Sequence, residues 1–361
     1  MEKKELRPIL WIDAAKGICI VMVVLYHVVI TAYRSQYPAD ELLGALPEIG
    51  LHELVIAGLA PLRMPLFFMI SGFLAARAAL RSGWPEVANK RVTLFVYLYL
   101  LWSVIQWASV ALMHALSGVV RPATEQAIYA DSLPEYLGAL LLGATDVWYL
   151  YALPAYFIAC KLLARRPLVA LLGFLALHTV GRLWVDSWPA GSILANGIYF
   201  CLGCFWGAPF FRRLTAPGLG ARAALVLPLL AACLVTRLFW EDWQAIPTSL
   251  LAIALVVVGL ERIQHRYPLR TLCWMGRNTL PIYVIHRIWI EIPDLYLRGN
   301  AVAPAEGAGA HAWYLLYPAL MTMLTVALSL VTWWASNRGI GKCLYALPGG
   351  VRIGLQRRSS A

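Results

Sequence analysis

Long apolar runs, separated by short polar stretches, dominate the pattern of this chain of 361 residues. A helix needs about 20 consecutive apolar residues to cross a bilayer. Ten runs approach this length, at 9–33, 54–76, 92–114, 146–163, 168–185, 192–211, 223–240, 245–261, 272–292 and 312–335. The pattern therefore predicts an all-α, polytopic membrane protein with about ten transmembrane helices.

The basic residues between these runs predict the topology. If alternate loops lie on opposite sides of the membrane, 21 of the 30 Lys and Arg residues fall in the two terminal segments and in the loops on the same side as these termini. Only five fall on the other side or at its span ends, namely Arg34, Arg121, Arg182, Arg237 and Arg298. Cytoplasmic loops carry such an excess of Lys and Arg, so both termini are predicted to be cytoplasmic. Topology thus accounts for most of the net charge of +11 without a nucleic-acid partner.

The composition excludes an ordinary soluble domain. Hydrophobic residues make up 61% of the chain and charged residues 14%, against about 45–50% and about 25% in soluble proteins. The first run is predicted to stay as a helix and not to be a cleaved signal peptide, because it is long and contains Asp13 and Lys16. The seven cysteines lie mostly in or beside the runs and are read as small packing residues. We expect one transmembrane domain at 1–340 and a basic cytoplasmic tail at 341–361.

Ionisable residues within the runs are the main candidates for function, because a charge at membrane depth is costly unless it is partnered. Lys16 and His27 are 11 residues apart and share one helical face, roughly 16 Å apart along the axis. Asp13 can neutralise Lys16 at the i, i+3 spacing. Lys16 reaching the inner headgroups, and His27 serving only in helix packing, remain as alternatives.

Arg63 lies on the second run between two prolines, Pro61 and Pro65. At roughly 13 Å below the outer start of the span, this cation requires an anionic or strongly polar partner. The alternative is a structural ion pair with a carboxylate such as Glu53 or Glu291.

The ninth run ends with His286 and Arg287, at a depth comparable to that of His27. Two histidines and arginines at one level indicate a polar cavity that opens outward. Trp148 and Tyr149 open the fourth run on the same side, where aromatic residues of an interfacial belt are the alternative reading.

Four segments resemble one known family. Trp11–Ile18, WIDAAKGI, is followed by His27 with ten residues between Lys16 and His27. The other three segments are RMPLFFMISGF at 63–73, WYLYAL at 148–153 and GRNTLPIY at 276–283. In order and spacing they resemble the membrane acyltransferase 3 family, in particular bacterial inner-membrane proteins related to fucose 4-O-acetylase. The resemblance implies a multi-pass inner-membrane O-acyltransferase of ten helices that uses cytoplasmic acyl-CoA, usually acetyl-CoA, to modify cell-surface or exported carbohydrate.

The resemblance places the family's catalytic histidine on His27 and its paired basic residue on Lys16. Arg63 and His286 are predicted to stabilise the developing oxyanion at the same depth. Substrate contacts are predicted for Asp13, Ser71, Trp148, Tyr149, Tyr283 and Arg287. Acyl-CoA, as donor substrate, is expected to meet Lys90, Arg91 and Arg277 at the inner rim. The family often has a second arginine three residues after the first, where this chain has Leu94.

O-acylation needs a base that takes the proton from a hydroxyl as it attacks the thioester carbonyl. Neutral imidazole is suited to this role because its unperturbed pKa is about 6.5. The predicted partners are the bilayer, acyl-CoA and a carbohydrate acceptor, with no metal and no permanently bound cofactor. A transporter or flippase for an anionic or glycan substrate is the main alternative, and a membrane scaffold is another. The absence of an internal repeat counts against transport.

Overall fold

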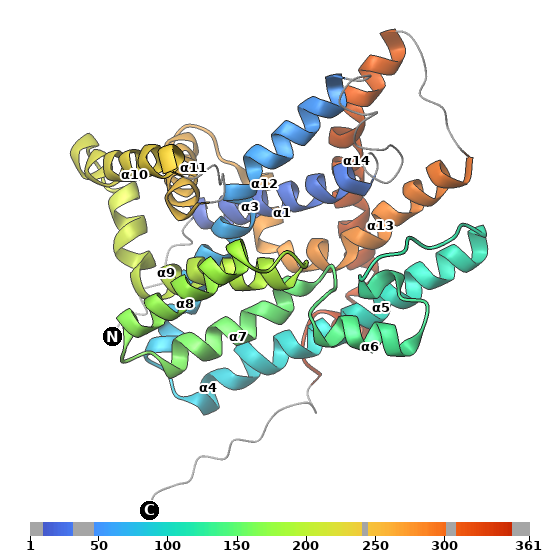
Figure 1. The fold of residues 1–361 in the computed structure, drawn as a ribbon, viewed down its shortest axis with the longest axis horizontal. Coiled ribbons are helices and arrows are strands. Elements are labelled where there is room, and N and C mark those ends of the chain that lie inside the picture. Colours follow the sequence, from blue (N-terminus) through green and yellow to red (C-terminus); the bar gives the residue numbers. More distant parts are fainter. Residues whose placement is uncertain (1–9, 32–46, 240–244, 301–307, 349–361) are drawn as a thin grey trace, which may run out of the picture.

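The computed structural model describes residues 10–31, 47–239, 245–300 and 308–348, and every regular element in these ranges is a helix. The predicted all-α fold class is therefore confirmed for the described part of the chain. The helices form one bundle with α1 in its interior (Figure 1). Arg34 and the tail residues beyond 348, which entered the topology prediction, lie outside the described residues.

The α-helices are α1 (Leu10–Val29), α3 (Pro47–Leu80), α4 (Trp84–Ala88), α5 (Leu94–Ser117), α6 (Leu133–Leu141), α7 (Trp148–Leu162), α8 (Pro167–Leu183), α9 (Ala190–Thr215), α10 (Leu219–Phe239), α11 (Ile246–Gln264), α12 (Arg270–Arg277), α13 (Thr279–Asn300) and α14 (Ala308–Ser336). The π-helical turn η2 (Asn89–Thr93) joins α4 to α5, and the 3₁₀ helices are η3 (Ala127–Tyr129) and η4 (Gly339–Leu344).

Seven helices among the described residues are long and apolar enough to cross a membrane. They cover Trp11–Val29, Gly50–Leu80, Trp84–Ser117, Ala190–Thr215, Leu219–Thr236, Ile246–Gln264 and His311–Ser336. Each corresponds to one of the ten predicted spans. Two further predicted spans coincide with α7 and α8, which are shorter at 15 and 17 residues.

The ninth predicted span, 272–292, is wrong as a continuous helix. The helix is interrupted at Asn278, whose φ of −111° and ψ of 34° are not helical. The two parts, α12 and α13, are therefore separate helices. The α13 helix also extends past the end of that predicted span to Asn300, and α14 begins at Ala308. The apolar-run criterion missed the outer turns of α13 because they carry charged residues.

The central helix α1 packs against α3, α11, α12, α13 and α14. Its crossing with α12 is very close, because a methyl group added at Gly17 would overlap the backbone carbonyl of Leu272. A methyl group at Gly276 would likewise overlap the carbonyl oxygen of Asp13. Only glycine fits such an approach of two backbones. The contact holds the ends of α12 and α1 together, and with them Arg277 and Asp13.

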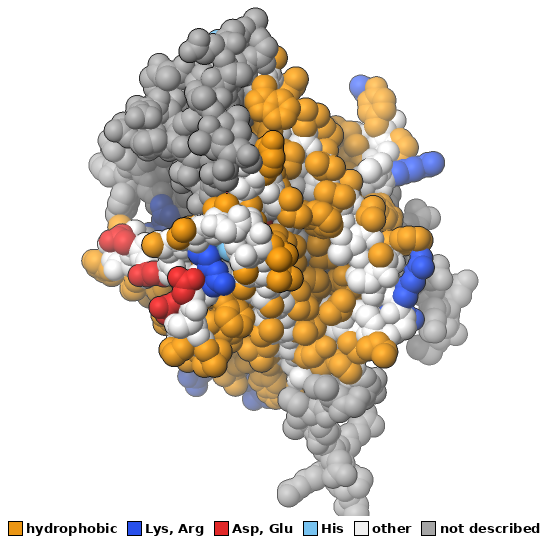
Figure 2. All heavy atoms as spheres, turned by 90° about the vertical axis from the view of Figure 1, so that its right-hand side faces the viewer, with side chains coloured by type: hydrophobic (Ala, Val, Ile, Leu, Met, Phe, Trp, Pro, Cys, Tyr) orange, Lys and Arg blue, Asp and Glu red, His pale blue; other side chains and the backbone are white. Residues whose placement is uncertain are grey.

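Apolar side chains cover much of the outer surface, as a membrane protein requires. Figure 2 shows one face on which hydrophobic side chains predominate and charged side chains lie mainly toward the edges. The helix α10 is the extreme case, since none of the residues in its apolar window is buried inside the protein. All seven cysteines are free, and Cys160, Cys201 and Cys204 are buried between α7 and α9.

The first part of the predicted tail packs on the bundle. The indole of Trp102 on α5 donates a hydrogen bond to the carbonyl of Leu344 at 2.7 Å, and the Tyr97 hydroxyl donates to the carbonyl of Cys343 at 2.9 Å. Residues 339–345 therefore contact the transmembrane domain, while 349–361 lie outside the described residues.

Candidate active site

The break at Asn278 determines how the polar residues of α13 are placed. The backbone N–H of Asn278 donates to the carbonyl oxygens of Trp274 and Met275, and its side-chain amide donates to the Trp274 carbonyl at 2.9 Å. Asn278 thus caps the C-terminal end of α12. After the break, α13 places Tyr283 and Arg287 on one face at the i, i+4 spacing. His286 is one residue before Arg287 and is fully buried.

The structure contains a cavity of ≈ 620 Å³ whose walls come from α1, α3, α7, α8, α9, α13 and the segment before α6. Of the predicted site residues it is lined by His27, Arg63, Trp148, Tyr283 and Arg287. Its polar lining also includes residues that the sequence analysis did not single out: Gln126, Tyr129, Asp146, His178, Arg182, Ser192, Asn196 and Tyr199. The predicted polar cavity at the depth of His27 is therefore present. We refer to it as the outer cavity, since the predicted topology puts it on the external side.

His286 lies behind His27 and is not part of the cavity wall. The two imidazole rings have their centroids 5.1 Å apart. Nδ1 of His286 lies 2.7 Å from the carbonyl oxygen of Tyr283, so that nitrogen is a donor. In the neutral ring Nε2 is then an acceptor, and it has no hydrogen-bond partner within the described residues. This arrangement suits a residue that acts on His27 better than one that donates to substrate.

Arg287 is the centre of a buried charge network. Its guanidinium pairs with Asp146 at 3.3 Å and with Glu291 at 3.0 Å, and it also donates to the hydroxyl of Tyr129. The Tyr129 hydroxyl donates to Glu291 at 2.9 Å, and Nε2 of His114 lies 3.0 Å from the second Glu291 oxygen. Two carboxylates thus neutralise the arginine, which ties α13 to η3, α5 and the start of α7.

The sequence analysis missed most of this network. Glu291 had been suggested only as a possible partner of Arg63, and Asp146, His114 and Tyr129 had not been predicted as site residues. The i, i+4 spacing of Arg287 and Glu291 was the one available signal. The contributions of His114 and Tyr129 depend on a loop that returns to the bundle, which no local pattern reveals.

Arg63 has a different environment from Arg287. Its guanidinium carbon lies 3.7 Å from the centroid of the Tyr26 ring, on the helix that carries His27. The suggested ion pair with Glu291 is wrong, because that carboxylate is bound by Arg287 and His114. Within the described residues, Arg63 forms no ion pair with any carboxylate.

A second, smaller cavity of ≈ 190 Å³ lies on the side of Lys16. Of the predicted site residues it is lined by Lys16, Ser71, Arg91, Tyr149 and Tyr283, with mostly apolar side chains for the rest of its wall. We refer to it as the inner cavity. Lys16 bonds to Asp13 at 3.3 Å, and Arg277 lies 3.8 Å from the same carboxylate.

The three predicted CoA contacts are not equivalent. Arg91 lines the inner cavity and donates to the carbonyl of Leu74 at 3.4 Å. Lys90 and Arg277 are exposed and do not belong to the cavity wall. The π-helical turn η2 carries Lys90 and Arg91 directly before α5.

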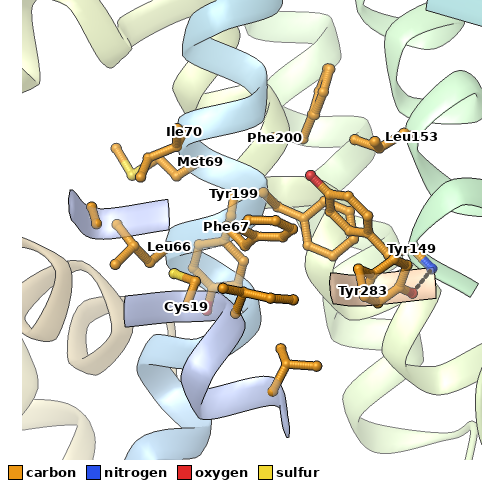
Figure 3. Packing of buried hydrophobic residues seen from close by; sticks show 14 of the residues in the cluster. Cys19, Leu66, Phe67, Met69, Ile70, Tyr149, Leu153, Tyr199, Phe200 and Tyr283 are labelled. Atoms are coloured by element: carbon orange, nitrogen blue, oxygen red, sulfur yellow. Dashed lines mark hydrogen bonds between the residues drawn. The ribbon is translucent and has the colours of Figure 1, made fainter. Parts of the chain in front are cut away.

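The aromatic rings of Phe67, Tyr149 and Tyr283 lie close together, as Figure 3 shows from close by. Tyr283 lines both cavities, and its hydroxyl donates to the carbonyl of Asp146 at 3.0 Å and accepts from the backbone N–H of Tyr149 at 3.2 Å. The Tyr149 ring packs on Phe67, with centroids 4.7 Å apart, and its hydroxyl lies 2.5 Å from that of Ser71. We call Phe67, Tyr149 and Tyr283 the aromatic partition.

Comparisons with known proteins agree with the resemblance seen in the sequence. A family model described as an acyltransferase domain matches residues 9–334. The chain is also 32% identical to the inner membrane protein YcfT of Escherichia coli (strain K12) over 366 residues, which covers 96% of this chain and 97% of that protein. No solved structure matches the chain.

Proposed function

We propose, from the premise that this chain belongs to the membrane acyltransferase 3 family, that it transfers an acyl group from cytoplasmic acyl-CoA to a hydroxyl of a carbohydrate on the outer side of the membrane. Acetyl is the expected acyl group. The observation that carries the proposal is the pair of cavities on opposite sides of the aromatic partition, one lined by Lys16 and the other by His27.

The inner cavity is suited to the donor. Its volume of ≈ 190 Å³ and its mostly apolar wall can take the thioester end of the pantetheine arm with its acyl group but not the nucleotide of CoA. The phosphates of CoA then lie at a basic rim, which consists of Arg91 in the cavity wall and the exposed Lys90 and Arg277 outside it. Lys16, partly neutralised by Asp13, lies along the path of the arm.

The outer cavity is suited to a carbohydrate acceptor. Small-molecule sites commonly have about 300–1,000 Å³, and this one has ≈ 620 Å³ with aromatic and amide side chains in its wall, among them Trp148, Trp188 and Asn196. Aromatic faces pack against the apolar faces of sugar rings, and amides bond to hydroxyls.

His27 is the proposed base. The neutral imidazole takes the proton of the acceptor hydroxyl while its oxygen bonds to the thioester carbonyl carbon. Collapse of the tetrahedral intermediate breaks the C–S bond, and the proton passes from His27 to the CoA thiolate as it leaves. Tyr283, which borders both cavities, marks the place where thioester and hydroxyl meet.

The proposed location is the bacterial inner membrane, with multiple spans. The relative from Escherichia coli is named as an inner membrane protein, and the basic loops of this chain follow the positive-inside rule. An acyl-CoA donor on the cytoplasmic side and an exported acceptor on the other agree with this location.

The test compares His27→Gln with wild type in inverted membrane vesicles that contain the native glycans and receive radiolabelled acetyl-CoA outside. His265→Gln is the matched control, because that histidine is exposed and pairs only with Glu261 across one helical turn. We expect label in glycan and release of CoA thiol, both reduced about 100 to 10,000 fold in His27→Gln and unchanged in His265→Gln. Full activity of His27→Gln would refute the assigned base, and wild-type vesicles that transport glycan without consuming acetyl-CoA would refute the enzyme.

A further inference from the structure

The two deep arginines of the outer cavity differ in how their charge is balanced. Arg287 is held by Asp146 and Glu291, both of which are buried, so its charge is neutralised within the protein. Arg63 packs on the Tyr26 ring and, within the described part of the chain, has no carboxylate partner. Of these two arginines, Arg287 has carboxylate counterions within the described part of the protein and Arg63 has none there.

Arg63 keeps donors that a ligand can use. A guanidinium has five N–H donors, and Arg63 contacts the ring and the hydroxyl of Tyr26, which leaves other donors for a ligand. These donors match the two oxygens of a carboxylate or phosphate in a bidentate arrangement. Because a cation at membrane depth is costly without a counterion, and because Arg63 lines the outer cavity, a ligand can supply the missing anion.

The remaining charges of the cavity point the same way. Among its described lining residues are three arginines, Arg63, Arg182 and Arg287, and a single carboxylate, that of Asp146. Asp146 is bound to Arg287 and cannot also serve Arg63. No carboxylate of the described wall is thus available to Arg63, which is not expected for a site that binds only neutral sugars.

We propose that the acceptor is an acidic carbohydrate and that Arg63 binds its carboxylate or phosphate group. This inference rests on the proposed function and names the substrate class of the same site. Tyr26 directly precedes His27 on α1, so an acid group held by Arg63 fixes a neighbouring hydroxyl near the base. A permanent anion of the acceptor, present before the reaction begins, matches a permanent cation better than an oxyanion that exists only in the transition state.

The kinetic test uses matched acceptors in proteoliposomes with labelled acetyl-CoA: methyl glucuronide for the carboxylate, glucose 6-phosphate for the phosphate, and methyl glucoside as the neutral member. Wild type is expected to prefer one acidic member, and which one it prefers distinguishes carboxylate from phosphate. Arg63→Gln should raise KM for that member about 10 to 100 fold, the worth of a charge-assisted hydrogen bond, with kcat at saturation retained. Arg63→Lys should recover part of the loss, and Arg266→Gln, on an exposed inner loop, is the control.

A binding experiment separates this inference from the proposed function, because it needs no turnover. Glucuronate and inorganic phosphate are added to the purified protein in detergent, and the melting temperature is followed. At least one of them should stabilise wild type and not Arg63→Gln. Equal shifts in both proteins, no shift in wild type, or a preference for the neutral acceptor would overturn the inference. A fall in kcat with unchanged KM in Arg63→Gln would also overturn it and assign Arg63 to the reaction's own oxyanion, with the proposed function intact.

Discussion

The most informative perturbation of stability is Glu291→Gln, which removes one charge from the buried network and keeps the shape of the side chain. Glu291 is fully buried, and both of its oxygens are engaged. One lies 3.0 Å from Nε2 of His114, and the other accepts from Tyr129 at 2.9 Å and pairs with Arg287 at 3.0 Å. An amide can keep an oxygen as the acceptor for Tyr129, but it carries no charge to pair with Arg287.

The magnitude follows from burial. Arg287 keeps Asp146 as a counterion at 3.3 Å, so the loss is that of one buried interaction with a charged group, about 1.5–3 kcal/mol. Asp131→Asn is the matched control: Asp131 pairs with Arg121 at 3.2 Å, but its side chain is 78% exposed. An exposed pair contributes about 0–1 kcal/mol. The same type of substitution should therefore cost more free energy of unfolding at the buried site than at the exposed one.

The measurement is the free energy of unfolding in detergent for wild type and both variants, with loss of helical circular dichroism as the readout. We expect Glu291→Gln to be destabilised by about 1.5–3 kcal/mol and Asp131→Asn to be close to wild type. If Glu291→Gln lost less than about 1 kcal/mol, the network would be solvated, and the assignment of Arg287 as internally neutralised would fail. The contrast between Arg287 and Arg63 would then fail with it.

Three further predictions concern Tyr283, Lys161 and the membrane topology. Tyr283→Ala should join the two cavities and raise hydrolysis of acetyl-CoA relative to acyl transfer, whereas Tyr283→Phe, which keeps the ring, should not; free acetate and labelled glycan measured in parallel decide this. Lys161→Met should lower the free energy of unfolding by about 1.5–3 kcal/mol, because the Lys161 ammonium bonds to the carbonyls of Ala78 and Ser82 at the end of α3; unchanged denaturation of the variant would contradict it. Reporter enzymes fused at Ser82 should be cytoplasmic and those at Asp131 external, and the opposite result would reverse the assignment of the inner and outer cavities.

The apolar runs were enough to determine the fold class and most of the helices. Hydrophobic length is a local property, and a segment such as the one around Cys19 must be helical in lipid because no water satisfies its backbone. The same local information placed Lys16 and His27 on one face of the first helix. It failed for the ninth span, where the apolar run continues across the break at Asn278 and ends before the charged outer turns of α13.

The tertiary structure decided which of the polar residues belong together. From the sequence, Arg63 and Arg287 were cations at similar depth, and Glu291 was suggested as a partner of Arg63. Packing assigns both carboxylates to Arg287 and leaves Arg63 on an aromatic ring facing the cavity. The physical reason is that ion pairs depend on distances of a few ångström between side chains. These distances are set by the packing of α1, α5, α7 and α13 and by the loop that carries Tyr129. Local sequence patterns do not encode this packing.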